Sequence, residues 1–508
     1  MLAVGFIGGL IASNDFDGID QRLAEVERLL TVPTQELVVA DEQEFVRLPA
    51  AVESYRSALS LIQGDVSGTV VHAQSALTRA AADDYLTVAS ASALMGIAAW
   101  AEGDLCVAHE AYRTASDNLS RAGNIPDVMG CAITLADIEM TQGNLGQAQQ
   151  TFQSALAQSK PGAGPLRGTA DMYVGLSRVA RERGDLLTAA DHLRTADQLG
   201  ETVGLPQYPY RWRVGMAHLR AAQGDMAAAV ALLDEAERVY VGDFAPNVRP
   251  ISAARARMLV AAGDLTGALG WARDRGITAA DDLTYQREYE HLTLARVLLA
   301  DHTTNRREAA LAGATGLLDR LLAAAQAGGR TASAIEALTL QALARDAAGS
   351  REQASASLEA ALRYAEPEGY VEVFTNQDPR MLPLLQELNR RNRDWTPVQN
   401  VLAACAQHDS TSGAPTSTTA GTTFLPRRDQ ERPAPLELVD PLSSRELDVL
   451  RLLRSDLDGP AIARELGVSL STVRTHTQHI YVKLGVSNRR AAIRRAHQLN
   501  LDFHAVRR

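Results

Sequence analysis

Residues 170–200 read ADMYVGLSRVARERGDLLTAADHLRTADQLG, and this stretch shows the unit from which most of the chain is built. Two runs with helical length and apolar periodicity, 170–183 and 186–200, flank the pair Gly184-Asp185. Glycine can take the left-handed conformation that ends a helix, and aspartate can cap the helix that follows. The stretch therefore predicts a helical hairpin.

The glycine pair recurs along the chain with nearly constant spacing. Its copies are Gly64-Asp65, Gly103-Asp104, Gly143-Asn144, Gly184-Asp185, Gly224-Asp225 and Gly263-Asp264. Successive glycines lie 39 to 41 residues apart, and a later copy, Gly349-Ser350, follows one near residues 301–306 that lacks the pair. Alanine usually stands five residues after the glycine, at Ala108, Ala148, Ala189, Ala229, Ala268 and Ala354. A residue this small lets two antiparallel helices approach closely.

These repeats predict an all-α fold in which helical hairpins stack into a solenoid. The array resembles tetratricopeptide-like repeats, although its period exceeds their usual length of about 34 residues. Composition agrees, because aromatic residues make up only 5% of the 508 residues. We expect the array to occupy residues 1–405 and to close with the segment 368–374 (EGYVEVF) and a short helix near 381–390.

A different pattern begins at residue 441, where the sequence reads PLSSRELDVLRLLRSDLDGPAIARELGVSLSTVRTHTQHIYVKLGVSNRRAAIRRAHQL. Ser443 and Glu446 form a capping box that starts a first helix, and Gly467 permits a tight turn before a third. The first helix has an apolar face of Leu447, Leu450 and Leu453, with Val449 and Leu452 on its flanks. The third has one predicted buried stripe, Val473, Thr477, Ile480 and Leu484. Its opposite face carries Arg474, Thr475 and Gln478. Arginine and glutamine can bond guanine and adenine edges, so this construction predicts a helix-turn-helix that reads the DNA major groove.

The same segment resembles a LuxR-type (GerE-like) DNA-binding domain over about sixty residues. The matching positions are Leu442, Ser443, Arg445, Glu446, Val449, Leu450, Ile462, Ala463, Leu466, Ser469, Thr472, Val473, Arg474, His476, Lys483, Leu484, Val486 and Arg489. The resemblance implies that Arg474, Thr475 and Gln478 face bases, and that Thr472 and Lys483 lie near phosphates. The complete set expected to bind DNA is Ser469, Ser471, Thr472, Arg474, Thr475, Gln478, Lys483 and Arg489. The chain departs from the family pattern at residues 458–461.

Charge is distributed unevenly between the two patterns. Residues 441–508 contain 12 basic and 6 acidic residues, a net charge of +6, whereas the other 440 residues carry −17. A single basic module on an acidic chain is the asymmetry expected when only that module meets phosphate. Between them, residues 406–440 are rich in Ser, Thr, Gly and Pro, which predicts a disordered linker that tethers the module flexibly.

The order of array, linker and module resembles the C-terminal half of the large ATP-binding LuxR regulators, the MalT-like group. Those regulators also carry a nucleotide-binding domain, yet no G-x-x-x-x-G-K-[ST] motif occurs in this chain. We therefore predict no cofactor. His476 and His479 stand three residues apart, but no cysteine or acid lies at ligand spacing, so no metal is predicted either.

The sequence thus predicts a bacterial cytoplasmic, nucleoid-associated transcription regulator rather than an enzyme. Its three cysteines form no CxxC motif, and the apolar stretch 1–13 is too short to cross a bilayer, so no membrane partner is expected. We expect this stretch to be the first helix of a hairpin that returns through residues 19–30, and a weak signal peptide is the alternative. The array would sense an unknown ligand or protein, and the module would bind double-stranded DNA. A homodimer on DNA, formed through the helix 488–499, is implied by the resemblance alone.

The alternative is a repeat scaffold whose DNA module is vestigial or merely anchors it. A hydrolase or NTPase is disfavoured, because no nucleophile–base or phosphate-binding motif appears.

Overall fold

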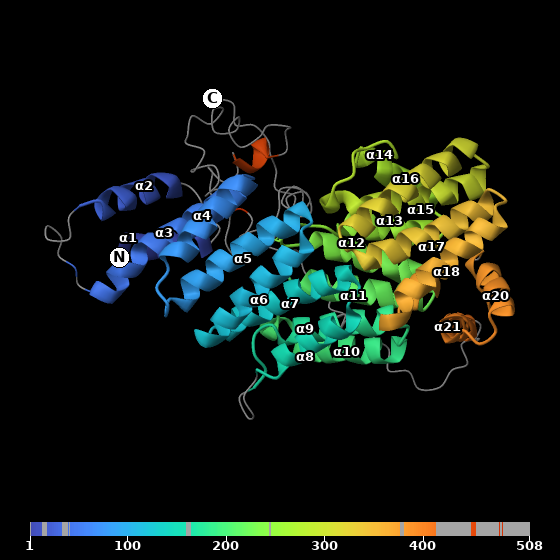
Figure 1. Cartoon of the computed structure of the whole chain (residues 1–508), viewed down its shortest axis with the longest axis horizontal. Helices are drawn as coiled ribbons and strands as arrows, with labels where there is room; N and C mark the ends of the chain where they lie inside the picture. Colours follow the sequence, from blue (N-terminus) through green and yellow to red (C-terminus); the bar gives the residue numbers. More distant parts are fainter. Residues whose placement is uncertain are drawn as a thin grey trace, which may run out of the picture. The chain divides into compact units, whose positions relative to one another are not determined.

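The computed structural model describes residues 2–12, 18–32, 39, 41–158, 164–242, 245–375, 380–412, 449–453, 477 and 480. The chain divides into two compact units, Met1–Pro415 and Thr416–Arg508. In the described part of the first unit all regular elements are helices (Figure 1). They are α1 (Leu2–Ala12), α2 (Ile19–Leu30), α3 (Glu42–Ile62), α4 (Val66–Arg79), α5 (Tyr85–Glu102), α6 (Leu105–Arg121), α7 (Ile125–Gln142), α8 (Leu145–Leu156), α9 (Thr169–Glu182), α10 (Leu186–Leu199), α11 (Tyr208–Ala222), α12 (Met226–Arg238), α13 (Ile251–Ala261), α14 (Leu265–Asp274), α15 (Glu288–Asn305), α16 (Glu308–Ala327), α17 (Thr331–Ala347), α18 (Arg351–Ala365), α19 (Glu372–Thr375), α20 (Met381–Arg391) and α21 (Thr396–Ser412). Short 3-10 helices lie between some of them: η2 (Glu201–Val203), η3 (Tyr285–Arg287) and η4 (Glu366–Glu368).

The predicted hairpins are confirmed. Consecutive helices pack in pairs from α3–α4 to α17–α18 (Figure 1). The turn glycines have positive φ: Gly64 (79°), Gly103 (84°), Gly143 (93°), Gly184 (78°), Gly224 (85°), Gly263 (80°) and Gly349 (76°). Only glycine takes this conformation without a steric penalty, which explains why it recurs at each turn.

Hydrogen bonds at the turns show how the glycine pair works. At the α9–α10 turn, the N–H of Gly184 donates to the carbonyl of Arg181 over 2.8 Å, and that of Asp185 donates to the carbonyl of Ala180 over 2.9 Å. This is the Schellman arrangement, which satisfies carbonyls that a helix end would leave unpaired. The Asp185 carboxylate then accepts from the N–H of Thr188 over 3.0 Å and caps α10. Asp65, Asp104, Asp225 and Asp264 cap their helices in the same way, whereas the Asn144 side chain makes no such bond.

The repeat that lacks the glycine pair still forms a hairpin, α15–α16. Its turn begins at Arg306, which has a φ of 53° and is the non-glycine residue with positive φ within the described ranges. The N–H of Arg306 donates to the carbonyl of His302 over 2.8 Å and ends α15. The period predicted this turn near residues 301–306, although no glycine marks it.

The alanines five residues after the turn serve as predicted. Those at positions 108, 148, 189, 229, 268 and 354 are all completely buried. They stand one turn into the second helix of each hairpin, where a larger side chain would push the two helices apart.

The array also contacts itself one superhelical turn later, which the sequence analysis did not predict. α5 contacts η3, α7 contacts α17, and α9 contacts α19. The indole N–H of Trp100 donates to the hydroxyl of Tyr285 over 2.8 Å, and the N–H of Val371 donates to the carbonyl of Glu182 over 2.9 Å. Trp100 and Tyr285 are 185 residues apart in sequence. A small rotation at each repeat accumulates along a solenoid, and here it brings distant hairpins into contact.

The C-terminal helix of the array, α21, continues through the predicted limit at residue 405 to Ser412. The predicted helix near 381–390 is confirmed as α20. In the second unit, Leu450 and Ile480 are helical and Leu453 lies in a turn, and all three are buried as predicted. Val449, assigned to a flank, is also buried, and Thr477 is half-buried.

Candidate functional site

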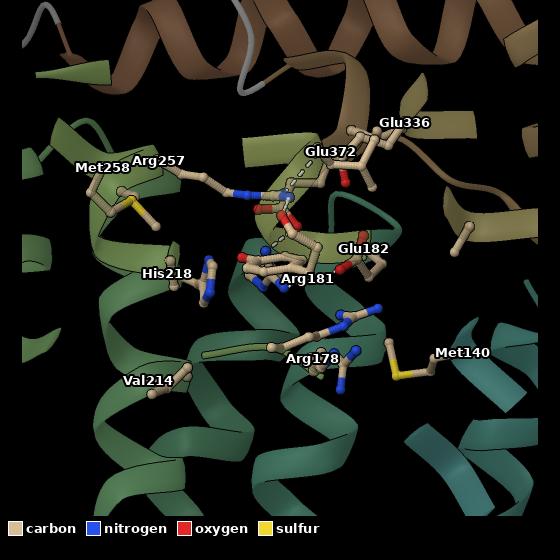
Figure 2. Close-up of a pocket in the computed structure, with 18 of the residues that line it drawn as sticks. Met140, Arg178, Arg181, Glu182, Val214, His218, Arg257, Met258, Glu336 and Glu372 are labelled. Atoms are coloured by element: carbon tan, nitrogen blue, oxygen red, sulfur yellow. Dashed lines mark hydrogen bonds and ion pairs between the residues drawn. The ribbon is translucent and has the colours of Figure 1, made fainter. Parts of the chain in front are cut away.

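The hairpins of the first unit surround a cavity of about 890 Å³. Its wall comes mainly from the first helix of successive hairpins, namely α7, α9, α11, α13, α15 and α17, and α19 adds residues across from α9. Figure 2 shows Arg178 and Arg181 of α9 and His218 of α11 projecting into the same space. The repeat therefore aims equivalent positions of neighbouring hairpins at one interior.

One position of the repeat supplies much of this polar lining. The residue six places before the turn glycine is Asp137, Arg178, His218 and Arg257 in four successive hairpins, and all four line the cavity. A solenoid superimposes equivalent positions from repeat to repeat, so a polar residue recurring there faces the same side each time. This recurrence is the signal from which the site could have been predicted, and the sequence analysis missed it.

Six arginines and six carboxylates line the cavity. They are Arg178, Arg181, Arg211, Arg249, Arg257 and Arg296, with Asp137, Asp171, Glu182, Glu288, Glu336 and Glu372. Arg178 pairs with Asp137, and Arg211 pairs with Asp171 over 3.2 Å. Glu288 pairs with Arg330, which lies outside the lining, over 2.8 Å. Buried charges are costly unless they are paired, so these contacts stabilise the charged wall.

Glu336 of α17 joins three helices through two arginines. Its carboxylate lies 2.9 Å from the guanidinium groups of both Arg257 on α13 and Arg296 on α15. Burial alone would raise the pKa of Glu336, but the two arginines outweigh it and lower that pKa to about 2. The guanidinium of Arg257 also lies 3.7 Å from the ring centroid of Tyr289, a cation–π contact.

Arg181 of α9 joins hairpins that are far apart in sequence. It pairs with Glu372 of α19, 191 residues away, and with its neighbour Glu182 over 3.1 Å. The side chains of Arg181 and Glu372 are both only 9% exposed, so this ion pair is buried. Burial opposes the charge of Arg181, yet the two carboxylates raise its pKa.

Two basic side chains of the cavity lack such partners. Within the described part of the chain, Arg249 has no carboxylate within ion-pair distance, and its guanidinium lies 5.8 Å from the ring centroid of Tyr289. His218 has no hydrogen-bond partner among the described residues. Burial, and then the charges of Arg181, Arg257, Arg178 and Arg249, hold the pKa of His218 well below its ordinary value. The imidazole is therefore neutral at physiological pH.

Aromatic residues are concentrated in the same place. Tyr210, Tyr240, Tyr285, Tyr289, Tyr370 and Trp100 line the cavity, although the whole chain has only 12 tyrosines and 4 tryptophans. Burial raises the pKa of Tyr285 to about 12, so its hydroxyl stays protonated. The lining offers fixed charges and flat apolar faces, a combination that binds small molecules.

The predicted DNA-binding residues lie outside the described residues, so their roles stay a prediction: Ser469, Ser471, Thr472, Arg474, Thr475, Gln478, Lys483 and Arg489. Within the described ranges, no group of three or more His, Cys, Asp or Glu side chains gathers to hold a metal ion. No described helix has both the length and the apolar character that crossing a membrane requires.

Comparison with protein families identifies both parts of the chain. Residues 50–391 match the family model described as MalT-like TPR region. Residues 440–496 match the model described as bacterial regulatory proteins, luxR family. The resemblances predicted from the array and from the C-terminal module are thereby confirmed, whereas the domain limits 1–405, 406–440 and 441–508 stay predictions.

Individual relatives agree with these matches. The chain is 26% identical over 306 residues to the HTH-type transcriptional regulator MalT of Klebsiella pneumoniae (strain 342), covering 58% of this chain and 32% of that protein. It is 49% identical over 67 residues to the probable transcriptional regulatory protein NarL of Mycobacterium tuberculosis, covering 13% of this chain and 30% of that protein. The chain thus spans about a third of the length of these curated relatives.

A solved structure resembles the array. The Rap protein complexed with competence and sporulation factor superposes with a TM-score of 0.50 at 12% identity, covering 72% of this chain and 97% of that one. At this level of identity the likeness shows the helical-repeat fold alone.

Proposed function

The chain belongs to the family of proteins with a MalT-like TPR region, and we propose that it is a DNA-binding transcription regulator. The C-terminal luxR-type module binds promoter DNA, and the repeat array binds an effector in the cavity between its hairpins. The match of residues 440–496 to the luxR family carries this proposal. The curated relatives are described as transcriptional regulators, which supports it further.

The cavity supports the sensor half of the proposal. Its volume of about 890 Å³ falls in the range of roughly 300–1,000 Å³ that small-molecule sites occupy. Its lining comes from several hairpins, so a ligand bound there would contact α9, α11 and α13 together. Such contacts would favour one curvature of the array over others, which is how a ligand shifts a conformational equilibrium. The proposal assigns the cavity a binding role and no catalytic one.

DNA recognition is assigned to the third helix of the module. Arg474, Thr475 and Gln478 would read base edges, and Thr472 and Lys483 would approach phosphates. By analogy with the family, two copies would bind a two-fold symmetric site through the helix 488–499. The chain would act in the cytoplasm, where it would meet the chromosome.

Substitutions in the module test this assignment. We expect Arg474→Ala to weaken binding to the preferred promoter fragment by about 1–3 kcal/mol and to relax sequence preference, because a bidentate base contact is lost. Lys483→Ala should weaken binding to all fragments equally and flatten the salt dependence by about one unit, because one phosphate contact is lost. Gel shift against a promoter library, repeated at several salt concentrations, measures both effects.

Lys160→Ala is the matched control, because Lys160 is the other lysine of the chain and belongs to the array. It should change neither the sequence preference nor the salt slope. Unchanged preference after Arg474→Ala would show that the reading face is assigned wrongly. If the full chain bound no promoter fragment better than random DNA, the scaffold alternative would replace the regulator.

A further inference from the structure

The carboxylates of the cavity are all neutralised by arginines, but its basic residues are not all paired. Asp137, Asp171, Glu182, Glu288, Glu336 and Glu372 each have at least one arginine partner. Among the described residues that line the cavity, Arg249 is the arginine left without a carboxylate in ion-pair distance. The wall therefore has one guanidinium group that makes no direct ion pair with the described residues, although the more distant charges of Asp137 and Glu182 raise the pKa of Arg249.

Arg249 stands directly before α13, and its side chain contacts the ring of Tyr289 but forms no ion pair with the described residues. It precedes Pro250, which has a φ of −58° and forms the N-cap of α13. The preceding residue, Val248, donates its N–H to the carbonyl of Pro246 over 2.9 Å and packs against the core. Arg249 itself is exposed, although it lines the cavity. A fixed backbone with an unpaired guanidinium presents a charge-assisted hydrogen-bond donor to whatever enters.

Other basic groups share the cavity wall with Arg249. Burial and then the charge of Arg249 lower the pKa of Arg178, so the two guanidinium groups lie close enough to repel. Arg249 and Arg178 also contribute to the low pKa of His218. A neutral imidazole keeps one N–H donor, and that of His218 has no partner among the described residues. An anion would relieve the repulsion and accept this hydrogen bond.

The rest of the lining suits a compact body attached to the anion. Tyr285, Tyr289 and Tyr370 enter the cavity from η3, α15 and the segment before α19. The Tyr285 hydroxyl is already bonded to Trp100, and that of Tyr370 donates to the carbonyl of Met140 over 3.2 Å. Arg257 lies over the ring of Tyr289, and the guanidinium of Arg330 lies 5.5 Å from the ring centroid of Tyr285. The tyrosines therefore place aromatic surface beside guanidinium groups, where a ring-shaped body could pack.

We propose that the cavity binds a small organic oxyanion, a carboxylate or phosphate ester with a compact apolar or ring-shaped body, whose charged group pairs with Arg249 and accepts a hydrogen bond from His218. This inference rests on the proposed function, because it names the chemical class of the effector. Carboxylates and phosphate esters share the negatively charged oxygen atoms that this site would bind. The experiment below distinguishes between the two classes.

Matched pairs of probes test the class. Phenyl phosphate is compared with phenol, and benzoate with benzamide, by calorimetry on the full chain at constant ionic strength. We expect at least one anion to bind about tenfold to a hundredfold more tightly than its neutral partner, the range for a hydrogen bond to a charged group. Binding of phenyl phosphate alone would identify a phosphate ester, and binding of benzoate alone a carboxylate.

Substitutions locate the site. Arg249→Gln should weaken binding of the anion about tenfold or more and leave the neutral probe unaffected. Arg238→Gln is the control, because Arg238 is an exposed arginine at the end of α12 that does not line the cavity. His218→Phe keeps a ring at this position but removes the N–H donor. It should weaken binding of the anion by roughly threefold to tenfold. Because Arg249 is exposed and forms no ion pair with the described residues, we expect Arg249→Gln to fold normally. Circular dichroism and thermal unfolding midpoints check this for each variant.

The inference is overturned if neither anion binds up to roughly 10 mM, if neutral probes bind as tightly, or if Arg249→Gln and Arg238→Gln behave alike. The same preparations are tested for promoter binding by gel shift. Intact promoter binding with any of those results rejects only the anion class. Loss of promoter preference in the unmodified chain would reject the proposed function itself.

Discussion

The turns at Gly103, Gly143 and Gly184 differ from those at Gly224 and Gly263, although all five share one sequence signature and one backbone conformation. A Cβ atom added at Gly103, Gly143 or Gly184 would meet Tyr285, Thr331 or Val371 at 2.8, 2.7 and 2.9 Å. A Cβ added at Gly224 or Gly263 would meet nothing within 4 Å. The first three turns therefore lie against the hairpins one superhelical turn later, and the other two are open.

This difference shows that one motif has two roles in the molecule. At every turn, glycine provides the positive φ that ends the helix. At Gly103, Gly143 and Gly184 it also leaves room for a side chain of a later hairpin. This second role depends on which hairpins the superhelix brings into contact. The two sets of turns therefore respond differently to the same substitution, and the contacts around them can be tested separately.

The largest expected loss of stability comes from breaking the buried ion pair between Arg181 of α9 and Glu372 of α19. Arg181→Ala should lower the free energy of unfolding by about 3–5 kcal/mol, because the buried carboxylate of Glu372 would lose its ion pair with the guanidinium of Arg181. Arg255→Ala is the matched variant, since the pair Arg255–Asp234 is exposed and should contribute no more than about 1 kcal/mol. Urea unfolding followed by circular dichroism measures both. Equal losses would show that the contact between α9 and α19 does not hold the array together.

A smaller effect is expected from Glu336, whose ion pairs join the neighbouring helices α13, α15 and α17 and should not depend on closure. Because its pKa is lowered from 4.5 to about 2, the ionised carboxylate stabilises the folded state above pH 4.5. This stabilisation is lost as the pH falls from about 4.5 towards 2. Glu336→Gln should therefore cost about 3 kcal/mol at pH 7.

Urea titrations at a series of pH values follow that contribution. The difference between Glu336→Gln and the unmodified chain should shrink steadily on acidification below pH 4.5. A difference that stayed constant down to pH 3 would mean that packing of the side chain, and not its charge, accounts for the loss.

The smallest expected effect is the difference in stability loss between the two kinds of turn. Gly143→Ala and Gly224→Ala should both cost about 1–2 kcal/mol, because alanine is strained at positive φ. Gly143→Ala should cost about 1–3 kcal/mol more, because its Cβ would lie 2.7 Å from that of Thr331. Thermal and urea unfolding of the pair measure this excess, and equal losses would contradict the close approach of α7 and α17.

Several particular elements could be predicted from the sequence. The turn glycines, the aspartate caps and the buried alanines follow from spacing within one repeat, and even the turn at Arg306 followed from the period. Asn144 does not cap through its side chain, because hydrogen bonding at one turn depends on local geometry that composition does not specify. Part of the cavity lining could also have been predicted, because a polar residue recurs six positions before the turn glycine at Asp137, Arg178, His218 and Arg257.

By itself, the sequence determined the hairpin unit, its turns and caps, and the resemblance of its C-terminal module to LuxR-type domains, because each depends on residues within about one repeat or one short motif. Only the tertiary structure decided that Trp100 contacts Tyr285 and that Arg181 pairs with Glu372. These contacts join residues some 185 positions apart. They depend on the rotation between neighbouring hairpins, added up over several repeats. A sequence pattern with a period of about 40 residues does not specify that total rotation.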